Sequence, residues 1–334
     1  MGGGPATGPR PGGSRSGGRG RGARGRVMDD HVITVLNNIG GFSFIALSAY
    51  LLLLSGEISF GQQAFYGIGA YASGVMTAMF GMSFWLALPL AMIVSGLAAA
   101  LVGGLTLRLR GLYFAIATLA FAETIRLILV ATTWQVEVDG EPVGPNGSEG
   151  LGNIRWGFDN EYEPVDFLWM IYGSLGIVLL LFFLMERSRL GSIVRTIGAD
   201  RLLAETQGIN VTRYKILVAG LAGAIAAIGG AFYAHIQTTV YPENFDVMLG
   251  VHSLAYGLIG GLGTAVGPIL GVLLDVGFLE AVEWVQGYRM IVFGGLVAVL
   301  LIFMPRGILD ERRVHRLRTM LRGWRAETHG AAGN

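Results

Sequence analysis

The sequence predicts an all-α fold, a polytopic transmembrane helical bundle of about 8 to 9 membrane segments. Hydrophobic residues make up 52% of the 334 residues and charged residues only 14%, a balance unlike that of ordinary soluble domains. A helix needs roughly 20 apolar residues to cross a hydrocarbon core of ~30 Å, and the chain holds many stretches of about that length. Its 53 glycines, many of them inside these stretches, are typical of membrane helices that pack closely.

The apolar stretches follow one another along the chain, separated by polar interruptions. They cover residues 31–54, 61–81, 84–106, 112–133, 167–185, 214–236, 249–262, 264–284 and 288–304. Two differ from a simple crossing, because 249–262 is short and 61–81 carries Gln62, Gln63 and several glycines. Either could be a broken or re-entrant element, since non-helical backbone is tolerated at membrane depth where protein buries it or where it lines a cavity.

Charge predicts the orientation of the bundle. The loop 186–213 and the tail 311–334 are rich in arginine, so both are expected in the cytoplasm together with the C-terminus. The loop 134–165 holds seven acidic residues against the single Arg155 and is expected on the extracytoplasmic side. Residues 1–27, made mostly of glycine and arginine, are expected to be a disordered tail or an upstream extension, which leaves 28–310 as the transmembrane domain.

The amino-acid composition excludes several kinds of chemistry. The chain has no cysteine, so disulfides, thiolate catalysis and cysteine-ligated metals are excluded. Its single lysine, Lys215, does not stand in the Gly-Lys-Ser/Thr pattern of a phosphate-binding loop. Any ATP that drives this protein must therefore be hydrolysed by another polypeptide. We expect no enzymatic activity, no metal, no cofactor and no nucleic-acid partner for the chain itself.

A polar interruption between membrane segments, residues 191–210, is the most informative feature. It predicts a short helix over about 199–207 that ends at Gly208, a residue suited to follow a helix C-terminus. Arg201 and Glu205 are spaced to pair at i and i+4. Such a helix either docks in the groove of a partner protein or only connects two membrane segments, and the spacing alone leaves both open.

Two further groups of polar residues lie inside apolar stretches. Glu123 and Arg126 share one helical face, and because a charge at the middle of a membrane costs about 2.5–3.5 kcal/mol, we expect them to pair or to line a polar interior, with a proton relay as the alternative. The glycine-rich element 56–74 either contributes to a pore or packs closely against other helices. Its candidate pathway residues are Ser59, Gly61, Gln62 and Tyr71.

Several separate stretches, in the right order, carry a family resemblance. They are Gly56-Glu57-Ile58-Ser59-Phe60-Gly61-Gln62 with 67–71, 108–123, Ala204-Glu205-Thr206-Gln207-Gly208-Ile209-Asn210, Gly260-Gly261-Leu262-Gly263-Thr264 with Gly267-Pro268, and Pro305-Arg306-Gly307. Over roughly residues 35–310 the chain resembles the LivM-type permease subunits of branched-chain amino acid ABC importers, and 204–210 resembles their EAA loop. The family usually has a further hydrophobic segment before the first one found here.

The resemblance implies a permease in the inner membrane, surrounded by lipid, that forms a translocation pathway with a sister subunit of LivH type. Two cytosolic ABC ATPases would bind the ATP and magnesium and dock on the EAA-like loops, and an extracytoplasmic binding protein would deliver leucine, isoleucine or valine. The expected coupling residues are Arg201, Leu202, Ala204, Glu205 and Gly208.

Two rival functions stay open. One keeps the ABC architecture and changes the cargo to urea, short amides or other amino acids. The other is an ion-coupled secondary transporter, in which Glu123, Arg126 and Asp275 would do the coupling.

Overall fold

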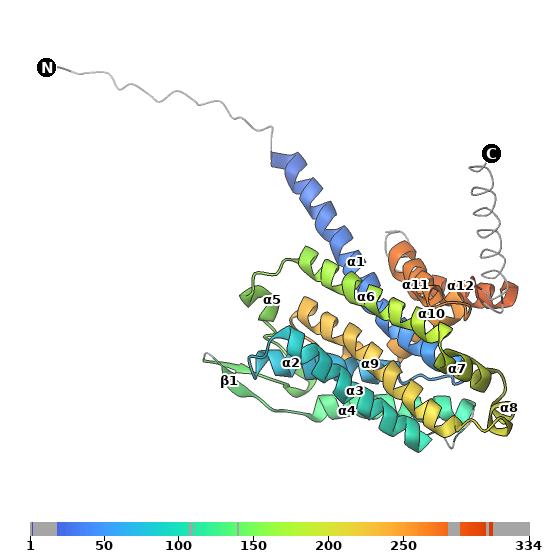
Figure 1. The fold of residues 1–334 in the computed structure, drawn as a ribbon. Coiled ribbons are helices and arrows are strands. Elements are labelled where there is room, and N and C mark those ends of the chain that lie inside the picture. Colours follow the sequence, from blue (N-terminus) through green and yellow to red (C-terminus); the bar gives the residue numbers. More distant parts are fainter. Residues whose placement is uncertain are drawn as a thin grey trace, which may run out of the picture.

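The computed structural model describes residues 2, 19–106, 109, 111–138, 140–279, 288–304 and 307–309, with side chains from residue 31 onward except at 279, 289 and 301. This part of the chain is almost entirely helical (Figure 1). Five helices are long and apolar enough to cross a membrane, so the predicted fold class, an all-α polytopic bundle, is confirmed.

Each of the nine predicted stretches forms a helical element. These are α1 (Arg19–Leu54), α2 (Gln62–Ala78), α3 (Phe84–Thr106), α4 (Leu112–Ala131), α6 (Pro164–Arg187), α9 (Val211–Gln237), α10 (Val247–Gly260), α11 (Val266–Val272) with the π-helical η3 (Leu273–Leu279), and α12 (Arg289–Phe303). The five long candidate spans are α1, α3, α4, α6 and α9. The others are shorter. A non-helical stretch, residues 55–61, precedes α2, and the π-helical η3 continues α11.

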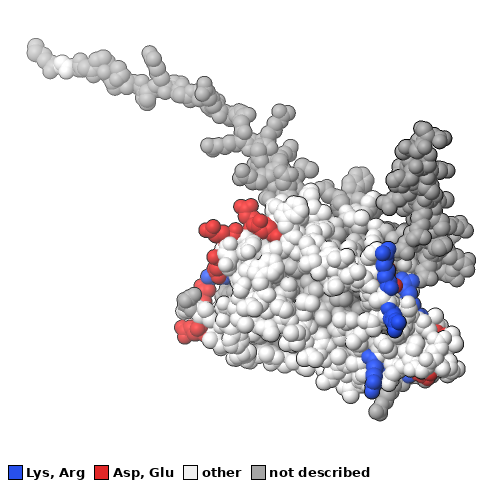
Figure 2. Space-filling view, viewed as in Figure 1, with Lys and Arg blue, Asp and Glu red and all other residues white. Residues whose placement is uncertain are grey.

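The helices run alternately between two ends of the molecule. Near one end Asn37 of α1 donates a hydrogen bond to the carbonyl of Pro164, the first residue of α6. At the other end Gly198 packs against the last turn of α1. We call the first the acidic end (residues 132–163 and 238–246) and the second the basic end (residues 187–215). Figure 2 shows the acidic and basic side chains gathered at opposite ends.

The acidic end is built from small elements. A hairpin of β1 (Val136–Val138) and β2 (Glu141–Val143) is followed by η1 (Gly147–Glu149) and α5 (Trp156–Asp159), and η2 (Pro242–Phe245) lies between α9 and α10. A β-bridge between Leu151 and Val240 joins the loop to the end of α9. The sequence predicts turns here but not the hairpin, because strands of three residues are too short for a recognisable alternation.

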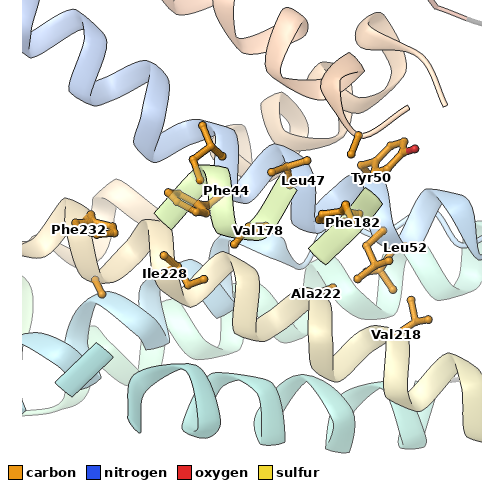
Figure 3. Close-up of a cluster of buried hydrophobic side chains, with 14 of the residues drawn as sticks. Phe44, Leu47, Tyr50, Leu52, Val178, Phe182, Val218, Ala222, Ile228 and Phe232 are labelled. Carbon is orange, nitrogen blue, oxygen red and sulfur yellow. The ribbon is translucent and has the colours of Figure 1, made fainter. Parts of the chain in front are cut away.

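Helix α9 is the centre of the bundle and packs against α1, α2 and α3. A Cβ added to Gly69 of α2 would overlap Ala227 of α9, and one added to Gly223 of α9 would overlap Ala99 of α3. Small residues therefore let these backbones approach closely, as membrane helices require when lipid offers no competing hydrophobic force. Larger side chains from three helices fill the space on the other side of α9 (Figure 3): Phe44, Leu47, Val178, Phe182, Ile228 and Phe232.

The predicted tails are only partly described. Helix α1 already begins at Arg19, so residues 19–27 are helical where the sequence predicts disorder. A helix extends from an existing apolar helix one residue at a time without a new nucleus, which offsets the low helix propensity of the three glycines in this stretch. Apart from residue 2, the rest of the tail lies outside the described residues, as do Arg108, Arg110 and the C-terminal tail 311–334.

The close packing of α2 on α9 predicts the effect of a small substitution. Gly69→Val should lower the free energy of unfolding by about 1–3 kcal/mol, because the branched side chain has no room against Ala227. Thermal unfolding of the purified protein in detergent measures this. Gly176→Val on α6 is the control, since nothing lies within 4 Å of a Cβ there. Equal melting temperatures for the two variants would contradict the packing argument.

Candidate functional site

The polar interruption between α6 and α9 folds as two short helices, α7 (Arg189–Ala199) and α8 (Arg201–Thr206). The short helix predicted over about 199–207 corresponds to α8, whereas α7 is an additional helix that the prediction lacks, and Asp200 separates the two. Its side chain accepts hydrogen bonds from the backbone N–H of Leu202 (2.9 Å) and Leu203 (3.1 Å), and such a cap begins a new helix. We call residues 188–210 the α7–α8 unit.

The end of the unit follows the sequence prediction. Gly208 has φ +77°, a left-handed conformation that glycine adopts without the steric penalty of a Cβ. Its N–H donates to the carbonyl of Glu205 at 3.0 Å, and the N–H of Ile209 donates to Ala204 at 3.1 Å. Asn210 then caps α9 by accepting from the N–H of Arg213 at 3.1 Å. Short-range hydrogen bonds thus fix the path of the chain from α8 into α9.

The predicted coupling residues divide into an inner and an outer group. Ala204 is fully buried and packs with Ile197 of α7 and Val211 of α9, so it holds the unit together and does not face a partner. Leu202 is 71% exposed and Leu203 is 50% exposed, which makes this leucine pair the apolar contact that the unit offers. Beside the pair, Arg201 and Glu205 form a salt bridge of 2.9 Å.

A backbone contact joins the α7–α8 unit to the junction between α1 and α2. A Cβ on Gly198 of α7 would overlap the carbonyl of Leu54, and a Cβ on Gly56 would lie 3.0 Å from the Cα of Gly198. Only glycine at position 198 lets α7 approach the end of α1 this closely. The unit therefore rests directly on the start of the non-helical stretch 55–61.

A buried ion pair makes the second connection to the same stretch. The ammonium group of Lys215, near the start of α9, contacts the carboxylate of Glu57, and both side chains are only 7% exposed. Lys215 is the single lysine of the chain, and the sequence around it does not indicate which residue it pairs with. The signal was available in the composition, because a charge in an apolar stretch is rarely left unpaired, but the choice of Glu57 depends on contacts 158 positions apart.

A third contact holds the unit against α1 and α6. Arg195 of α7 forms a salt bridge of 3.4 Å with Glu186 at the end of α6. The hydroxyl of Tyr50 on α1 donates to the same carboxylate at 3.1 Å. The α7–α8 unit is therefore connected to α6 by a salt bridge, to α9 by the cap at Asn210, and to α1 by the close backbone approach at Gly198.

The stretch 55–61 leads into a buried polar cluster at the start of α2. The hydroxyl of Ser48 on α1 lies against the amide oxygen of Gln62 and 2.6 Å from the carbonyl of Ala222 on α9. The amide nitrogen of Gln62 donates to Ser59 at 3.3 Å. Hydrogen bonds in this dry interior hold three helices in one arrangement, because an unpaired polar group there would cost about 1–3 kcal/mol.

All four candidate pathway residues lie inside the chain. Ser59, Gly61 and Gln62 belong to the polar cluster or border it, and the buried Tyr71 donates to the carbonyl of Val240 at 3.3 Å. Their place in a pathway stays a prediction, since in this structure they connect helices. The neighbouring Gln63 is also buried, against Gly250 of α10, and its amide oxygen has no partner among the described residues.

The two charges of α4 contact each other. Arg126 donates to both carboxylate oxygens of Glu123, with a shortest distance of 2.5 Å. Both side chains are only partly buried by the rest of the chain. Glu243 of η2 and Asp246 at the start of α10 lie within electrostatic reach of the same guanidinium. This is the polar group that α4 presents outward at membrane depth.

Two further features bear on chemistry. Among the described residues, no group of three or more His, Asp or Glu side chains is placed to hold a metal ion. The acidic end contains a cavity of about 450 Å³ whose lining includes Arg155, Glu141 and Trp156. Arg155 and Glu141 form a salt bridge of 3.4 Å there, so this exposed loop offers charge of both signs.

Comparison with known proteins adds a family to this geometry. The family described as "Branched-chain amino acid transport system / permease component" matches residues 31–304. The high-affinity branched-chain amino acid transport system permease protein LivM of Salmonella typhimurium is 33% identical over 281 residues, which cover 78% of this chain and 65% of that protein. The chain thus matches about two thirds of the length of this relative.

Other relatives are more distant. The probable branched-chain amino acid transport permease protein LivH of Methanocaldococcus jannaschii is 24% identical over 82% of this chain and 90% of its own length. The ribose import permease protein RbsC of Escherichia coli is 26% identical over 48% of this chain and 50% of its own. No solved structure matches the chain.

The buried ion pair predicts a pattern of stability changes. Lys215→Met or Glu57→Leu should each lower the stability by about 3–5 kcal/mol, because each leaves a charge buried without its partner. The double variant Glu57→Leu/Lys215→Met should recover most of the loss. Thermal unfolding in detergent measures all three. A double variant that loses as much as the two single variants together would show that the residues do not act as a pair.

Proposed function

The chain belongs to the family of permease components of branched-chain amino acid transport systems, and from that premise we propose that it is the transmembrane permease subunit of an ATP-driven importer of leucine, isoleucine and valine. The observation that carries the proposal is the α7–α8 unit. It presents an exposed leucine pair on one side and contacts the end of α1 and the start of the stretch 55–61 on the other. Such a unit suits the transfer of movement from a docked partner into a helix bundle.

The proposed coupling runs through named contacts. A cytosolic ATPase docks on Leu202 and Leu203 and moves when it binds ATP. The backbone contact at Gly198 and the ion pair of Lys215 with Glu57 carry this movement into residues 55–61. From there it reaches the polar cluster around Gln62, which joins α1, α2 and α9. The bundle then has two arrangements, and ATP shifts the population between them.

The orientation follows from the two charged ends. The basic end faces the cytoplasm and the acidic end faces outward, in agreement with the excess of arginine in cytoplasmic loops. The described residues nearest the C-terminus belong to the basic end. The N–H groups of Ile308 and Leu309 donate to the carbonyls of the last two residues of α10. The hydroxyl of Tyr50 lies between Leu262, just after α10, and Glu186 at the end of α6. The external binding protein would meet the cavity at the acidic end.

The proposed partners supply what the chain does not provide. A sister permease of LivH type completes the pathway, and two cytosolic ABC ATPases bind and hydrolyse ATP with magnesium. The chain itself performs no catalysis and needs no cofactor in this scheme. Its single lysine supports this division, since Lys215 is buried against Glu57 and does not stand in a phosphate-binding loop.

Reconstitution into liposomes tests the proposal. The complete assembly of the two permeases, the two ATPases and the binding protein should accumulate radiolabelled leucine, isoleucine and valine when ATP is present with the ATPases, and should not accumulate urea. The chain without its partners should transport nothing under a proton or sodium gradient. Gradient-driven uptake by the isolated chain would instead identify a secondary transporter, and accumulation of urea or a short amide alone would change the cargo.

The leucine pair gives a sharper test of coupling. Leu202→Asp should weaken association with the ATPase by roughly tenfold or more, because a charge replaces an exposed apolar contact at the proposed interface. Co-purification and ATP-driven uptake measure the effect. Ser192→Asp on α7 places the same charge on an exposed position of the same end and should leave both unchanged. Normal uptake by Leu202→Asp would reject docking at this site.

A further inference from the structure

The exposed face of α4 is unusual for a surface in contact with lipid. Only 22% of its membrane window is buried inside the chain, compared with 28% for α6, 33% for α3 and 61% for α1 and α9. Of the three least buried helices, α4 is the one with an ion pair in its window among the described residues. A helix with so little of its surface buried inside the chain must be covered by lipid, by another protein or by water. The charges that α4 presents decide among these three.

Glu123 and Arg126 lie within the candidate membrane span Leu112–Ala131. They stand eight and five residues before the last residue of α4, Ala131, or about 12 and 7.5 Å from its end at a rise of 1.5 Å per residue. Half of the hydrocarbon core is about 15 Å thick. A long arginine near a helix end can extend to the surface, but the shorter Glu123 lies deeper. Lipid is therefore a poor cover for this face.

More negative charge lies around Arg126 than the single carboxylate that a structural ion pair requires. Glu123 contacts the guanidinium directly, and Glu243 and Asp246 lie within its electrostatic reach from the other side of the seam between α4 and η2. Glu243 and Asp246 are both exposed and lie on or beside η2 and α10, the elements that pack against α4, so this side of the helix carries an excess of negative charge. A dry contact between proteins would leave the excess negative charge without compensation.

We propose that this face of α4 lines the substrate pathway, and that Glu123 and Arg126 receive the two charged ends of a zwitterionic amino acid. The planar guanidinium of Arg126 suits the substrate carboxylate, which it can bind with two parallel hydrogen bonds. The carboxylates of Glu123, Glu243 and Asp246 suit the substrate ammonium group. The inference rests on the proposed function for its substrate class, whereas the presence of water on this face can be tested without any cargo.

The absence of cysteine from the chain allows a clean labelling experiment. Leu127 and Ile128 are adjacent and are 53% and 52% exposed, but they point about 100° apart around the helix. Leu127 lies four residues after Glu123 and shares its face, whereas Ile128 points away from it. Leu127→Cys and Ile128→Cys are therefore matched in depth and exposure and differ in direction.

The labelling uses the complete assembly in vesicles and a membrane-impermeant trimethylammonium methanethiosulfonate, which reacts only with a hydrated thiolate. Leu127→Cys should react faster than Ile128→Cys by on the order of tenfold. Equal rates would overturn the proposal, because they would place the same surroundings on both faces. Absence of reaction at Leu127→Cys, with or without cross-linking to the sister subunit, would also overturn it by showing a dry face.

The role of the two charges is tested by uptake of leucine. Glu123→Gln and Arg126→Gln should each slow uptake by on the order of tenfold or more, because each removes one charge that the zwitterion needs. The reversed pair Glu123→Arg/Arg126→Glu keeps a salt bridge but changes its relation to Glu243 and Asp246, and it should not restore uptake. Full restoration by the reversed pair would assign a purely structural role. Failure of the unsubstituted assembly to import any amino acid would instead reject the proposed function and leave the labelling result standing.

Discussion

The buried ion pair between Glu57 and Lys215 is the contact on which the arrangement depends. It joins the first turns of α9, the central helix, to the non-helical stretch between α1 and α2, with both side chains almost completely removed from solvent. Charges in such surroundings remain only when they are paired, because removing one partner leaves the other without compensation. The pair therefore fixes the position of α9 relative to the start of α2. The backbone contact at Gly198 adds the α7–α8 unit to the same point.

The rest of the bundle is organised around this junction by small residues and by short polar contacts. Glycine and alanine let α2 and α3 lie directly on α9, while Ser48 and Gln62 hold α1, α2 and α9 together where the backbone of 55–61 is not helical. Non-helical backbone at membrane depth needs this kind of cover. The result is a rigid inner group of helices next to an open α4, whose charges lie on the outside of the chain.

Much of the fold could be predicted from the sequence, because an apolar stretch of the right length determines a membrane helix almost alone. The bounds 84–106 predicted for α3 agree with the structure, and most other segments differ by a few residues, whereas α1 begins at Arg19, well before the predicted start at 31. The contacts within the candidate site could be predicted less well. The short helix around 201–206 could be predicted, and Asp200 caps its start. Neither the burial of Ala204 nor the pairing of Lys215 with Glu57 follows from spacing, since both depend on residues brought together by folding. The contacts of Ser48 with Gln62 and Ala222 likewise depend on folding, whereas the place of Ser59 and Gln62 in a pathway stays a prediction.

Distances between spin labels in the assembled transporter test the central claim, that the α7–α8 unit and the start of α2 move together. Ser192→Cys on α7 and Ile58→Cys in the stretch 55–61 are both exposed, and the chain has no other cysteine to interfere. The account predicts that the distance between these labels stays the same in the resting state and in the state trapped with ATP, while the distance from Ser192→Cys to Phe158→Cys at the acidic end changes. A change between Ser192→Cys and Ile58→Cys on trapping would contradict it, because the movement would then be lost at the junction.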